Sequence, residues 1–332
     1  MRSARTSMSM QQHTPKQLEE IVTSFASLRI GVVGDVMLDE YEYGFIERMS
    51  PEAPVPVIRM ESRVSMPGGA GNVATNIAAY GAMVDICSVV GNDTAATELR
   101  ALLEKGVVNT SGLLTTSRIT TLKKRIVAKG EHVVRVDYEM QSNISLEQEA
   151  MLRSSIANGI ASWDAVVIAD YAKGCITPEL VKSIIVLAAQ RNIPVIVDTK
   201  PQNLEYFKDV ALLTPNAKEV REMTDYEDIT TAGKELQAHT HSPVLVTQGE
   251  NGMTLFTENH SIHCPSFATS VIDVSGAGDT VVATASLALA SRVLYEEMVR
   301  LASIAAAVAV EKPGTATITT KELIERIYAE NT

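Results

Sequence analysis

The stretch from Asp273 to Asp279 has the residue types and spacing of a phosphoryl-transfer site. Gly276 and Gly278 can adopt backbone conformations that side chains disfavour, and the Ala-rich segment after them predicts a helix. The first N–H groups of a helix have no intrahelical partner, so such a turn attracts an anion, usually phosphate. Because phosphate repels a nearby carboxylate, Asp279 needs a role there. A fitting role is to accept the proton of a hydroxyl that attacks phosphorus.

The same stretch also has a purely structural interpretation. Glycine turns precede many helices, and Asp is common in a first helical turn. A strand is expected just before the turn, over Thr269, Val271 and Ile272. A dinucleotide fold would need another strand after the glycines, whereas residues 281–310 are rich in Ala and Leu at helical spacing. The segment alone supports the chemical and structural interpretations about equally.

Alternating strand and helix patterns predict an α/β fold, with a mostly parallel central sheet flanked by helices on both faces. The predicted strands cover residues 28–33, 84–90, 107–114, 165–169, 194–198, 211–213 and 244–247, with antiparallel edge strands over 253–256 and 261–264. The predicted helices cover residues 67–80, 94–105, 145–160, 177–190, 216–224 and 230–239. Polar residues follow several strands, and the carboxyl ends of parallel strands share one edge, so we expect a ligand site there.

A small β lid is predicted from residues 41–66 and 112–136. The first segment contains three prolines and alternating apolar residues, which fit no helix. The second segment alternates apolar residues with cations such as Lys123 and Arg125, and a hairpin turn is predicted at Gly130. A basic lid strand suits an anionic substrate, although a solvated strand face is the default explanation for such charges.

Asn216 and Glu219 are candidates for holding Mg²⁺. They are three residues apart and therefore share one face of a predicted helix start. An amide and a carboxylate there can hold Mg²⁺ through water, because this ion gives up its waters reluctantly. The structural alternative is a capping box, and the two interpretations are compatible.

Candidate sugar ligands follow the first strand and begin the first long helix. Asp35 and Asp39 can each accept hydrogen bonds from sugar hydroxyls. Gly68 and Gly69 allow the backbone to approach a substrate closely, and Asn72 offers both a donor and an acceptor.

Composition bounds the remaining possibilities. The 332 residues are 45% hydrophobic, enough for one large or two modest domains, and the net charge of −11 argues against nucleic acid or an anionic membrane as partner. No apolar run is long enough to span a bilayer, and residues 1–27, predicted to be a disordered tail, begin without an apolar signal core. Three scattered cysteines predict no disulfide framework or zinc site. A cytoplasmic location is expected.

The sequence resembles the ribokinase-like (PfkB) carbohydrate kinases. Residues 67–72 (Pro-Gly-Gly-Ala-Gly-Asn) and 273–279 (Asp-Val-Ser-Gly-Ala-Gly-Asp) resemble the two family signatures, and residues 214–219 match its Asn-x-x-Glu magnesium motif. The stretches at 34–39, 50–57, 170–174, 212–216 and 312–315 are similar to the D-glycero-D-manno-heptose-7-phosphate kinase branch. The resemblance implies a kinase domain over residues 28–332. Some members of the branch carry a fused nucleotidyltransferase domain, and this chain is expected to be a stand-alone kinase.

The resemblance implies phosphorylation of the anomeric hydroxyl of the heptose 7-phosphate by ATP with Mg²⁺. The product would be the 1,7-bisphosphate, on the way to ADP- or GDP-heptose and a lipopolysaccharide core or other surface glycan. A homodimer formed by pairing of lid strands is also implied.

The resemblance also assigns roles by position. Asp279 is implied as the base, the backbone of Gly276, Ala277 and Gly278 as the anion hole, and Asn216 and Glu219 as the magnesium and phosphate residues. The nucleotide residues implied are Thr247, Gly249 and Gly252, with Lys312 and Gly314 near adenine. The sugar residues implied are Asp35, Asp39, Gly68, Gly69 and Asn72. The candidates for binding the 7-phosphate are Lys123, Arg125 and Lys173.

Two positions depart from the family pattern, and two rival functions remain. Ser275 stands where many relatives have Thr, and Thr199 stands where Pro is expected between Asp198 and Lys200. The rivals are another PfkB-type kinase, acting on a different sugar or sugar phosphate, and a silent regulator that binds nucleotide or sugar. The intact Asp279 argues against the silent regulator.

Overall fold

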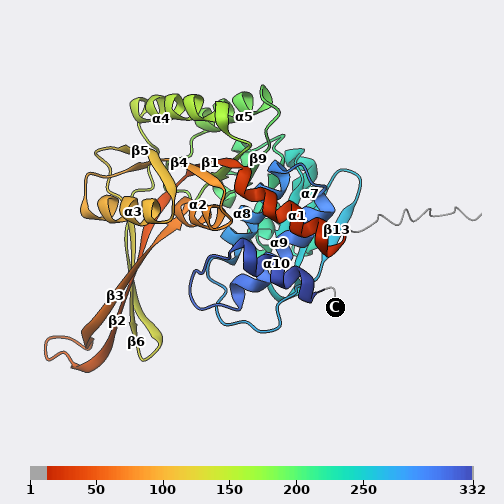
Figure 1. Cartoon of the computed structure of the whole chain (residues 1–332). Helices are drawn as coiled ribbons and strands as arrows, with labels where there is room; N and C mark the ends of the chain where they lie inside the picture. The colour runs from red at the N-terminus through yellow and green to blue at the C-terminus, as the bar shows by residue number, and fades with distance from the viewer. Residues whose placement is uncertain (1–12, 331–332) are drawn as a thin grey trace, which may run out of the picture.

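A computed structural model describes residues 13–330 of the chain and contains a nine-stranded central sheet (Figure 1). The strand order is β13-β12-β11-β10-β9-β8-β1-β4-β5. The bounds are β1 (Arg29–Gly34), β4 (Met83–Val90), β5 (Val108–Thr115), β8 (Ala165–Ala169), β9 (Val195–Asp198), β10 (Leu212–Leu213), β11 (Val244–Thr247), β12 (Met253–Phe256) and β13 (Ser261–Cys264). The strands from β5 to β11 pair in parallel, and β12 and β13 add an antiparallel edge. This confirms the predicted mostly parallel sheet.

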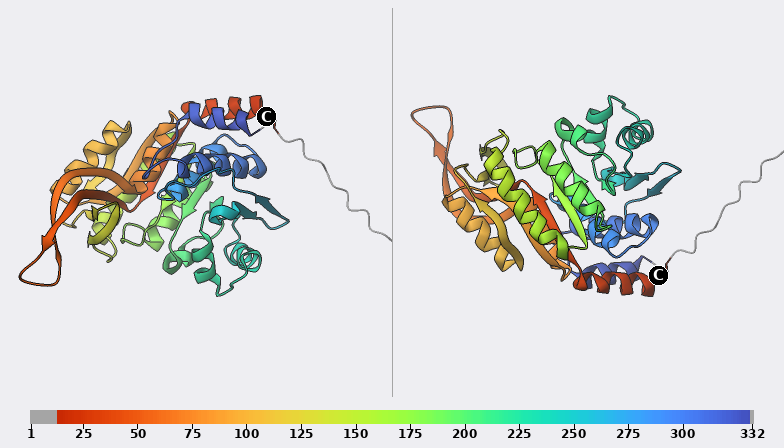
Figure 2. Two further views of the ribbon diagram at one scale, coloured as in Figure 1. Left: turned by 90° about the horizontal axis from the view of Figure 1, so that it is seen from below. Right: turned by 90° about the horizontal axis from the view of Figure 1, so that it is seen from above.

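Helices cover both faces of this sheet, as Figure 2 shows. One face packs against α1 (Pro15–Ser24), α2 (Ala70–Ala79), α3 (Thr94–Lys105), α8 (Ala277–Ala290), α9 (Tyr295–Val310) and α10 (Thr320–Ala329). The other face packs against α4 (Leu146–Gly159), α5 (Pro178–Ala189), α6 (Ala217–Thr224) and α7 (Ile229–Thr240). Successive strand residues point to opposite faces, so Val167 lies in the first core and Val166 in the second. Burial on both faces explains why these strands are continuous apolar runs.

The lid is a separate four-stranded sheet that projects from the body (Figure 1). Its order is β3-β2-β6-β7, with bounds β2 (Val36–Met49), β3 (Pro56–Gly69), β6 (Thr121–Ala128) and β7 (Glu131–Tyr138). The predicted lid boundaries need correction, because residues 112–115 belong to β5 of the central sheet and β2 and β3 extend past 41–66 at both ends. Only Asp35 separates β1 from β2, so the sequence pattern does not mark where the chain leaves one sheet for the other.

The prediction of a disordered tail over residues 1–27 is wrong for residues 13–27; residues 1–12 lie outside the described part. Helix α1 begins with a capping box between Thr14 and Gln17. Leu18, Val22 and Phe25 are fully buried, and α1 lies beside α10 in Figures 1 and 2. The apolar residues recur at helical spacing within a polar segment, and that spacing, more than the mean polarity, determines the structure.

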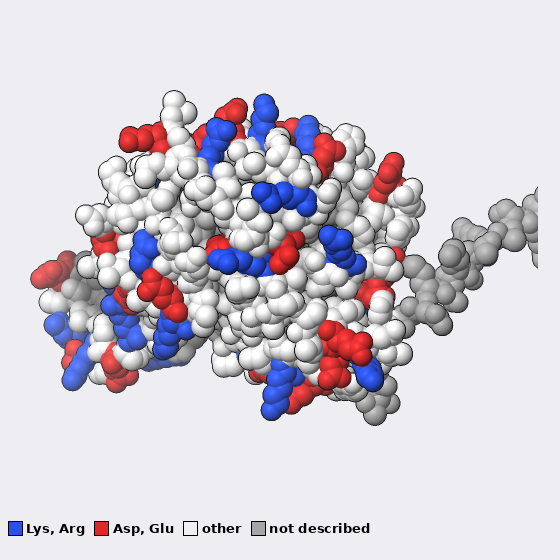
Figure 3. All heavy atoms as spheres, turned by 45° about the horizontal axis from the view of Figure 1, so that its top comes forward, with Lys and Arg blue, Asp and Glu red and all other residues white. Residues whose placement is uncertain are grey.

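Charges of both signs are interspersed on the face shown in Figure 3, which presents no continuous basic patch. Among residues 13–330, every helix is too short or too polar to cross a bilayer.

Candidate active site

The glycine turn before α8 places Asp279 in the first turn of that helix. Gly276 is the N-cap residue with φ 77° and ψ 1°, a left-handed conformation that favours glycine. A Cβ at this position would lie 3.1 Å from the Asn72 side-chain nitrogen, so the turn is also closely packed. The Ala277 N–H donates to the Val274 carbonyl at 3.3 Å, whereas the Gly278 N–H, at the second helical position, has no place in the intrahelical ladder. Of the predicted anion-hole amides, Ala277 is thus already used within the turn, whereas Gly278 is placed to bind phosphate.

The strand predicted before this turn does not form. Thr269–Val274 has no regular structure, and Ile272 hydrogen-bonds to Val310 at the end of α9. Val271 and Val274 are more than 60% exposed and line a cavity against α8 and α9. A β-branched run forms a strand only where a partner edge is available, and within residues 13–330 no strand pairs with this segment.

Asp279 is held by two side-chain donors from other parts of the chain. Asn72 of α2 donates to Asp279 Oδ2 at 2.5 Å, and the Tyr171 hydroxyl donates to Asp279 Oδ1 at 2.6 Å. Burial raises the pKa of Asp279, whereas the two hydrogen bonds and the nearby Lys200 ammonium act in the opposite direction. A carboxylate with a raised pKa, aimed into a cavity, suits the role of a general base.

Three cavities form a row, with Asp279 between the first two. The largest, about 720 Å³, lies between the lid and the body, and the second, about 200 Å³, lies over the glycine turn. Gly276 and Asp279 line both of these cavities. The third, about 320 Å³, shares Asn216, Thr247 and Gly278 with the second. Small and apolar side chains of α8 and α9 line this third cavity, including Val281, Ala306, Ala307 and Val310.

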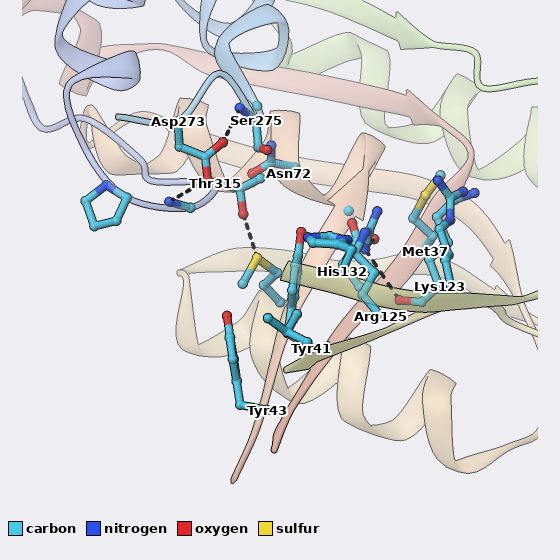
Figure 4. A pocket seen from close by; sticks show the side chains of 18 of the residues that line it. Met37, Tyr41, Tyr43, Asn72, Lys123, Arg125, His132, Asp273, Ser275 and Thr315 are labelled. Carbon is cyan, nitrogen blue, oxygen red and sulfur yellow. Dashed lines mark hydrogen bonds and ion pairs between the residues drawn. The ribbon is translucent and has the colours of Figure 1, made fainter. Parts of the chain in front are cut away.

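The largest cavity lies between the body and the lid, and both cationic and acidic side chains line it (Figure 4). Asn72, Asp273, Ser275 and Thr315 come from the body, and Tyr41, Tyr43, Arg125 and His132 face them from the lid. Arg125 pairs with Asp39 at 2.5 Å and lies over the Tyr41 ring.

Gly68 and Gly69, the predicted sugar residues, also line the largest cavity. A Cβ on Gly68 would come 2.0 Å from Asp39 Oδ2, and Gly69 has φ 57°. Position 69 therefore requires glycine, whereas a side chain at position 68 would displace the Asp39 carboxylate.

Lys123 and Lys173 share a carboxylate, that of Glu139. Lys173 lies 2.8 Å from Glu139, and Lys123 lies 3.4 Å from both Glu139 and Asp137. Burial raises the pKa of Glu139, but hydrogen bonds from Lys173 and Gln141 and the Lys123 charge lower it on balance. Lys173 does not line the largest cavity; it lines a smaller one of about 260 Å³ that also contains Lys123 and Lys200.

Asn216 and Glu219 form the capping box of α6. The Asn216 side chain accepts from the Glu219 N–H at 3.0 Å, and Glu219 Oε2 accepts from the Asn216 N–H at 3.0 Å. The remaining Glu219 oxygen pairs with Lys200 at 2.5 Å. Asp198 lies at the end of β9 in the same cavity, and burial together with neighbouring carboxylates raises its pKa to about 8, against the opposing charge of Lys200.

These residues fit Mg²⁺ through water and not as a closed protein cage. No cluster of three or more His, Cys, Asp or Glu with metal-binding geometry occurs within residues 13–330. The cavity instead offers an all-oxygen set from Asp198, Asn216 and Glu219, two of them carboxylates that repel one another. Oxygen donors and remaining waters are what Mg²⁺ prefers.

The prediction that Asp35 binds the sugar needs correction. Its buried carboxylate accepts backbone N–H groups of Tyr171 at 2.9 Å, Lys173 at 3.0 Å and Cys175 at 2.9 Å. It therefore fixes the loop after β8 and lines none of the cavities described here. A carboxylate after a first strand suits either role, so the sequence could not separate them.

Lys312 and Gly314, which are predicted to lie near adenine, are both outside the third cavity. Lys312 pairs with Glu322 at 2.5 Å, and the third cavity does not include it. Gly314 lines the largest cavity and donates to Asp273 at 3.1 Å. Thr247, Gly249 and Gly252, the other predicted nucleotide residues, line the third cavity.

Sequence reasoning assigned no role to Tyr171 or Asp198. Both lie at strand ends among the polar residues noted in the sequence, which is the signal that could have selected them.

Comparisons with known proteins agree with this geometry. A model described as "pfkB family carbohydrate kinase" matches residues 28–322. The bifunctional protein HldE of Geotalea uraniireducens is 38% identical over 320 residues, 94% of this chain and 65% of that protein. HldE of a Bradyrhizobium species is 41% identical over 319 residues, 93% of this chain and 65% of that protein. The chain thus spans about 65% of the length of these curated relatives.

Solved structures match the fold over nearly the whole chain. The crystal structure of a putative ribokinase from Agrobacterium tumefaciens has a TM-score of 0.76 at 20% identity, covering 92% of this chain and 98% of that one. Phosphofructokinase-2 from Escherichia coli, in complex with substrates and products, has a TM-score of 0.74 at 21% identity, covering 92% of this chain and 100% of that one. The predicted ribokinase-like α/β fold is confirmed.

Proposed function

Because the chain belongs to the pfkB family of carbohydrate kinases and is thus an ATP-dependent carbohydrate kinase, we propose that it phosphorylates the anomeric hydroxyl of D-glycero-D-manno-heptose 7-phosphate. The product would be the 1,7-bisphosphate, a precursor of ADP- or GDP-heptose for lipopolysaccharide core or another surface glycan. The observation that carries the proposal is the position of Asp279, between the cavity under the lid and the cavity over the glycine turn.

The three adjacent cavities support the proposal, because they offer separate space for sugar, phosphate and nucleoside. The sugar lies under the lid near Asn72, Gly68 and Gly69, the γ-phosphate over Gly278, and the nucleoside between α8 and α9. Asp279 accepts the proton of the C1 hydroxyl as that oxygen bonds to phosphorus and the bond to ADP breaks. The Gly278 amide and the N-terminal end of α8 stabilise the negative charge on the transferred group.

Asn216, Glu219 and Asp198 would hold Mg²⁺ through its waters. Bound there, the ion would neutralise charge on the phosphates of ATP. Lys200 pairs with Glu219 and lies near Asp279, so it holds positive charge on the same side of the cavity.

The lid supports a phosphorylated sugar as substrate. Lys123 and Arg125 line the largest cavity, and Lys173 lies beside it. Each is paired with a carboxylate that a bound phosphate can replace. The similarity of residues 50–57 to the heptose-7-phosphate kinase branch favours heptose among phosphorylated sugars.

The lid also suits a homodimer in which lid strands of two copies pair. Tyr43, Phe45, Ile46 and Met60 are each 38–40% exposed on β2 and β3, and such apolar surface favours association. A cytoplasmic location fits enzymes that use ATP.

A kinase assay of the purified chain with several candidate sugars tests the proposal. The chain would be incubated with ATP, Mg²⁺ and a panel of sugars: the heptose 7-phosphate, fructose 6-phosphate, ribose and a nucleoside. ADP formation would be followed and the product examined by ³¹P NMR. We expect the highest kcat/KM with the heptose 7-phosphate and a new anomeric phosphate. Faster turnover of another sugar would transfer the proposal to a sister kinase, and nucleotide or sugar binding without ADP formation would favour a silent regulator.

A further inference from the structure

Tyr171 connects the Asp279 carboxylate to the loop after β8. Its hydroxyl donates to Asp279 Oδ1 at 2.6 Å, while Asn72 donates to Oδ2 at 2.5 Å. Each carboxylate oxygen therefore has one fixed donor and keeps a lone pair free. The two donors come from different parts of the body, so together they determine both the direction and the rotation of the carboxylate.

The Tyr171 side chain is itself fixed from two sides. Its backbone N–H donates to the buried Asp35 carboxylate at 2.9 Å, in the loop that Asp35 holds with two further hydrogen bonds. The Lys200 ammonium lies 5.2 Å from the centre of its ring. The hydroxyl therefore reaches Asp279 from a rigid base. This arrangement also gives Asp35 a reason to be buried at the active-site edge of the sheet.

We propose that Tyr171 is a positioning residue for phosphoryl transfer, acting through the catalytic base. Its hydroxyl holds the Asp279 carboxylate ionised and aimed between the sugar and phosphate cavities, both of which Tyr171 lines. The inference rests on the proposed function, because it requires Asp279 to be the base. The hydroxyl remains a donor, since burial and the Asp279 charge raise the pKa of Tyr171 well above its ordinary value.

Several charges face Asp279, and they set the direction of the pH effect. Lys200 favours the ionised carboxylate, whereas Asp39 and Asp198 favour the protonated acid. Burial raises the pKa of Asp279, and the Tyr171 hydrogen bond offsets part of that rise. Glu219 lines the same cavity, and its carboxylate is paired with Lys200. Removal of the Tyr171 hydroxyl alone therefore raises the pKa of Asp279.

The first test is the pH profile of Tyr171→Phe, which keeps the ring beneath Lys200. We expect kcat to fall roughly 10-fold, a part of the loss caused by removing a general base. The acidic limb of the kcat/KM profile moves to higher pH by about half a unit or more, with KM for ATP unchanged. Tyr295→Phe is the matched control, because its hydroxyl donates to the Ala211 carbonyl away from the cavities. An acidic limb and kcat that stay at the wild-type values in Tyr171→Phe would overturn the inference.

A double-mutant cycle and a tyrosine analogue complete the test. If Tyr171 acts through Asp279, Tyr171→Phe has little further effect in the Asp279→Asn background; a full additional loss would contradict this. Replacement of Tyr171 by 3-fluorotyrosine keeps the shape of the site and makes the hydroxyl a stronger donor. It should move the acidic limb to lower pH, and an unmoved limb would overturn the inference even if the Phe variant folds poorly. Absence of sugar phosphorylation by the wild-type chain would instead reject the proposed function.

Discussion

Loss of the Lys173 charge should weaken binding of a phosphorylated sugar without affecting an unphosphorylated one. Lys173 lies 2.8 Å from Glu139 Oε2 and 2.9 Å from Oε1, so in the free enzyme this carboxylate occupies its ammonium. Lys123 contacts the same carboxylate at 3.4 Å, a longer and weaker pair. A substrate phosphate that binds the two lysines must therefore displace Glu139.

The magnitude follows from that exchange. A hydrogen bond to a charged group contributes about 1.5–3 kcal/mol, and about 1.4 kcal/mol corresponds to tenfold in affinity. Because Glu139 competes for the same ammonium, the lower end of this range applies. Lys173→Met should therefore raise KM for the sugar phosphate about tenfold. Glu139→Gln should have the opposite effect and lower this KM, since it removes the competing charge and leaves both lysines.

The assay compares KM for heptose 7-phosphate and for the corresponding unphosphorylated heptose at saturating ATP. Lys182→Met, on the exposed surface of α5, is the matched control and should change neither value. An equal rise for both sugars after Lys173→Met would refute the assignment of this lysine to the phosphate. A rise in KM after Glu139→Gln would refute the competition between carboxylate and phosphate.

Two further predictions concern stability. Burial and nearby carboxylates raise the pKa of Asp198 from 3.8 to about 8. Between these pH values the folded chain holds a proton on Asp198 that the unfolded chain has released. The free energy of unfolding therefore falls as pH rises through this range. Asp198→Asn removes this pH-dependent loss of stability, so in EDTA it should raise Tm more at pH 8.5 than at pH 5. An equal gain in Tm at both pH values would contradict the raised pKa. Phe25 is fully buried with its ring edge-on to Tyr80, so Phe25→Ala should lower the free energy of unfolding by about 3–5 kcal/mol in urea titrations. A loss as small as that of Ser24→Ala, an exposed control, would mean that Phe25, the residue that caps the end of α1, contributes little to the core.

The body of the fold was predictable because its strands are buried on both faces. β8, β11, β12 and β13 occur at their predicted bounds, and the others differ by a few residues. Such apolar runs, separated by amphipathic helices, permit few other arrangements. The wrong predictions concern segments whose secondary structure depends on tertiary contacts. The 269–272 run lacks a sheet edge, and α1 depends on packing against α10.

The candidate site was predictable at the residues whose backbone or charge has an unusual requirement. The left-handed Gly276 and the Asp279 carboxylate are visible as sequence signals, as is the Asn216–Glu219 capping box. Asp35 was misassigned because three backbone donors from a distant loop, invisible in the sequence, use its oxygens. The role of Tyr171 depends on the same juxtaposition of β1, β8 and α8.

Turnover of Asp279→Asn tests the central claim most directly. Saturating ATP and sugar phosphate would be used, and ATP binding would be measured separately by calorimetry. Because Asn cannot accept the hydroxyl proton, we expect ATP affinity close to that of the wild type and a kcat reduced by at least about 10²-fold. A variant with near-native kcat would show that Asp279 is not the base on which the proposed phosphoryl transfer depends.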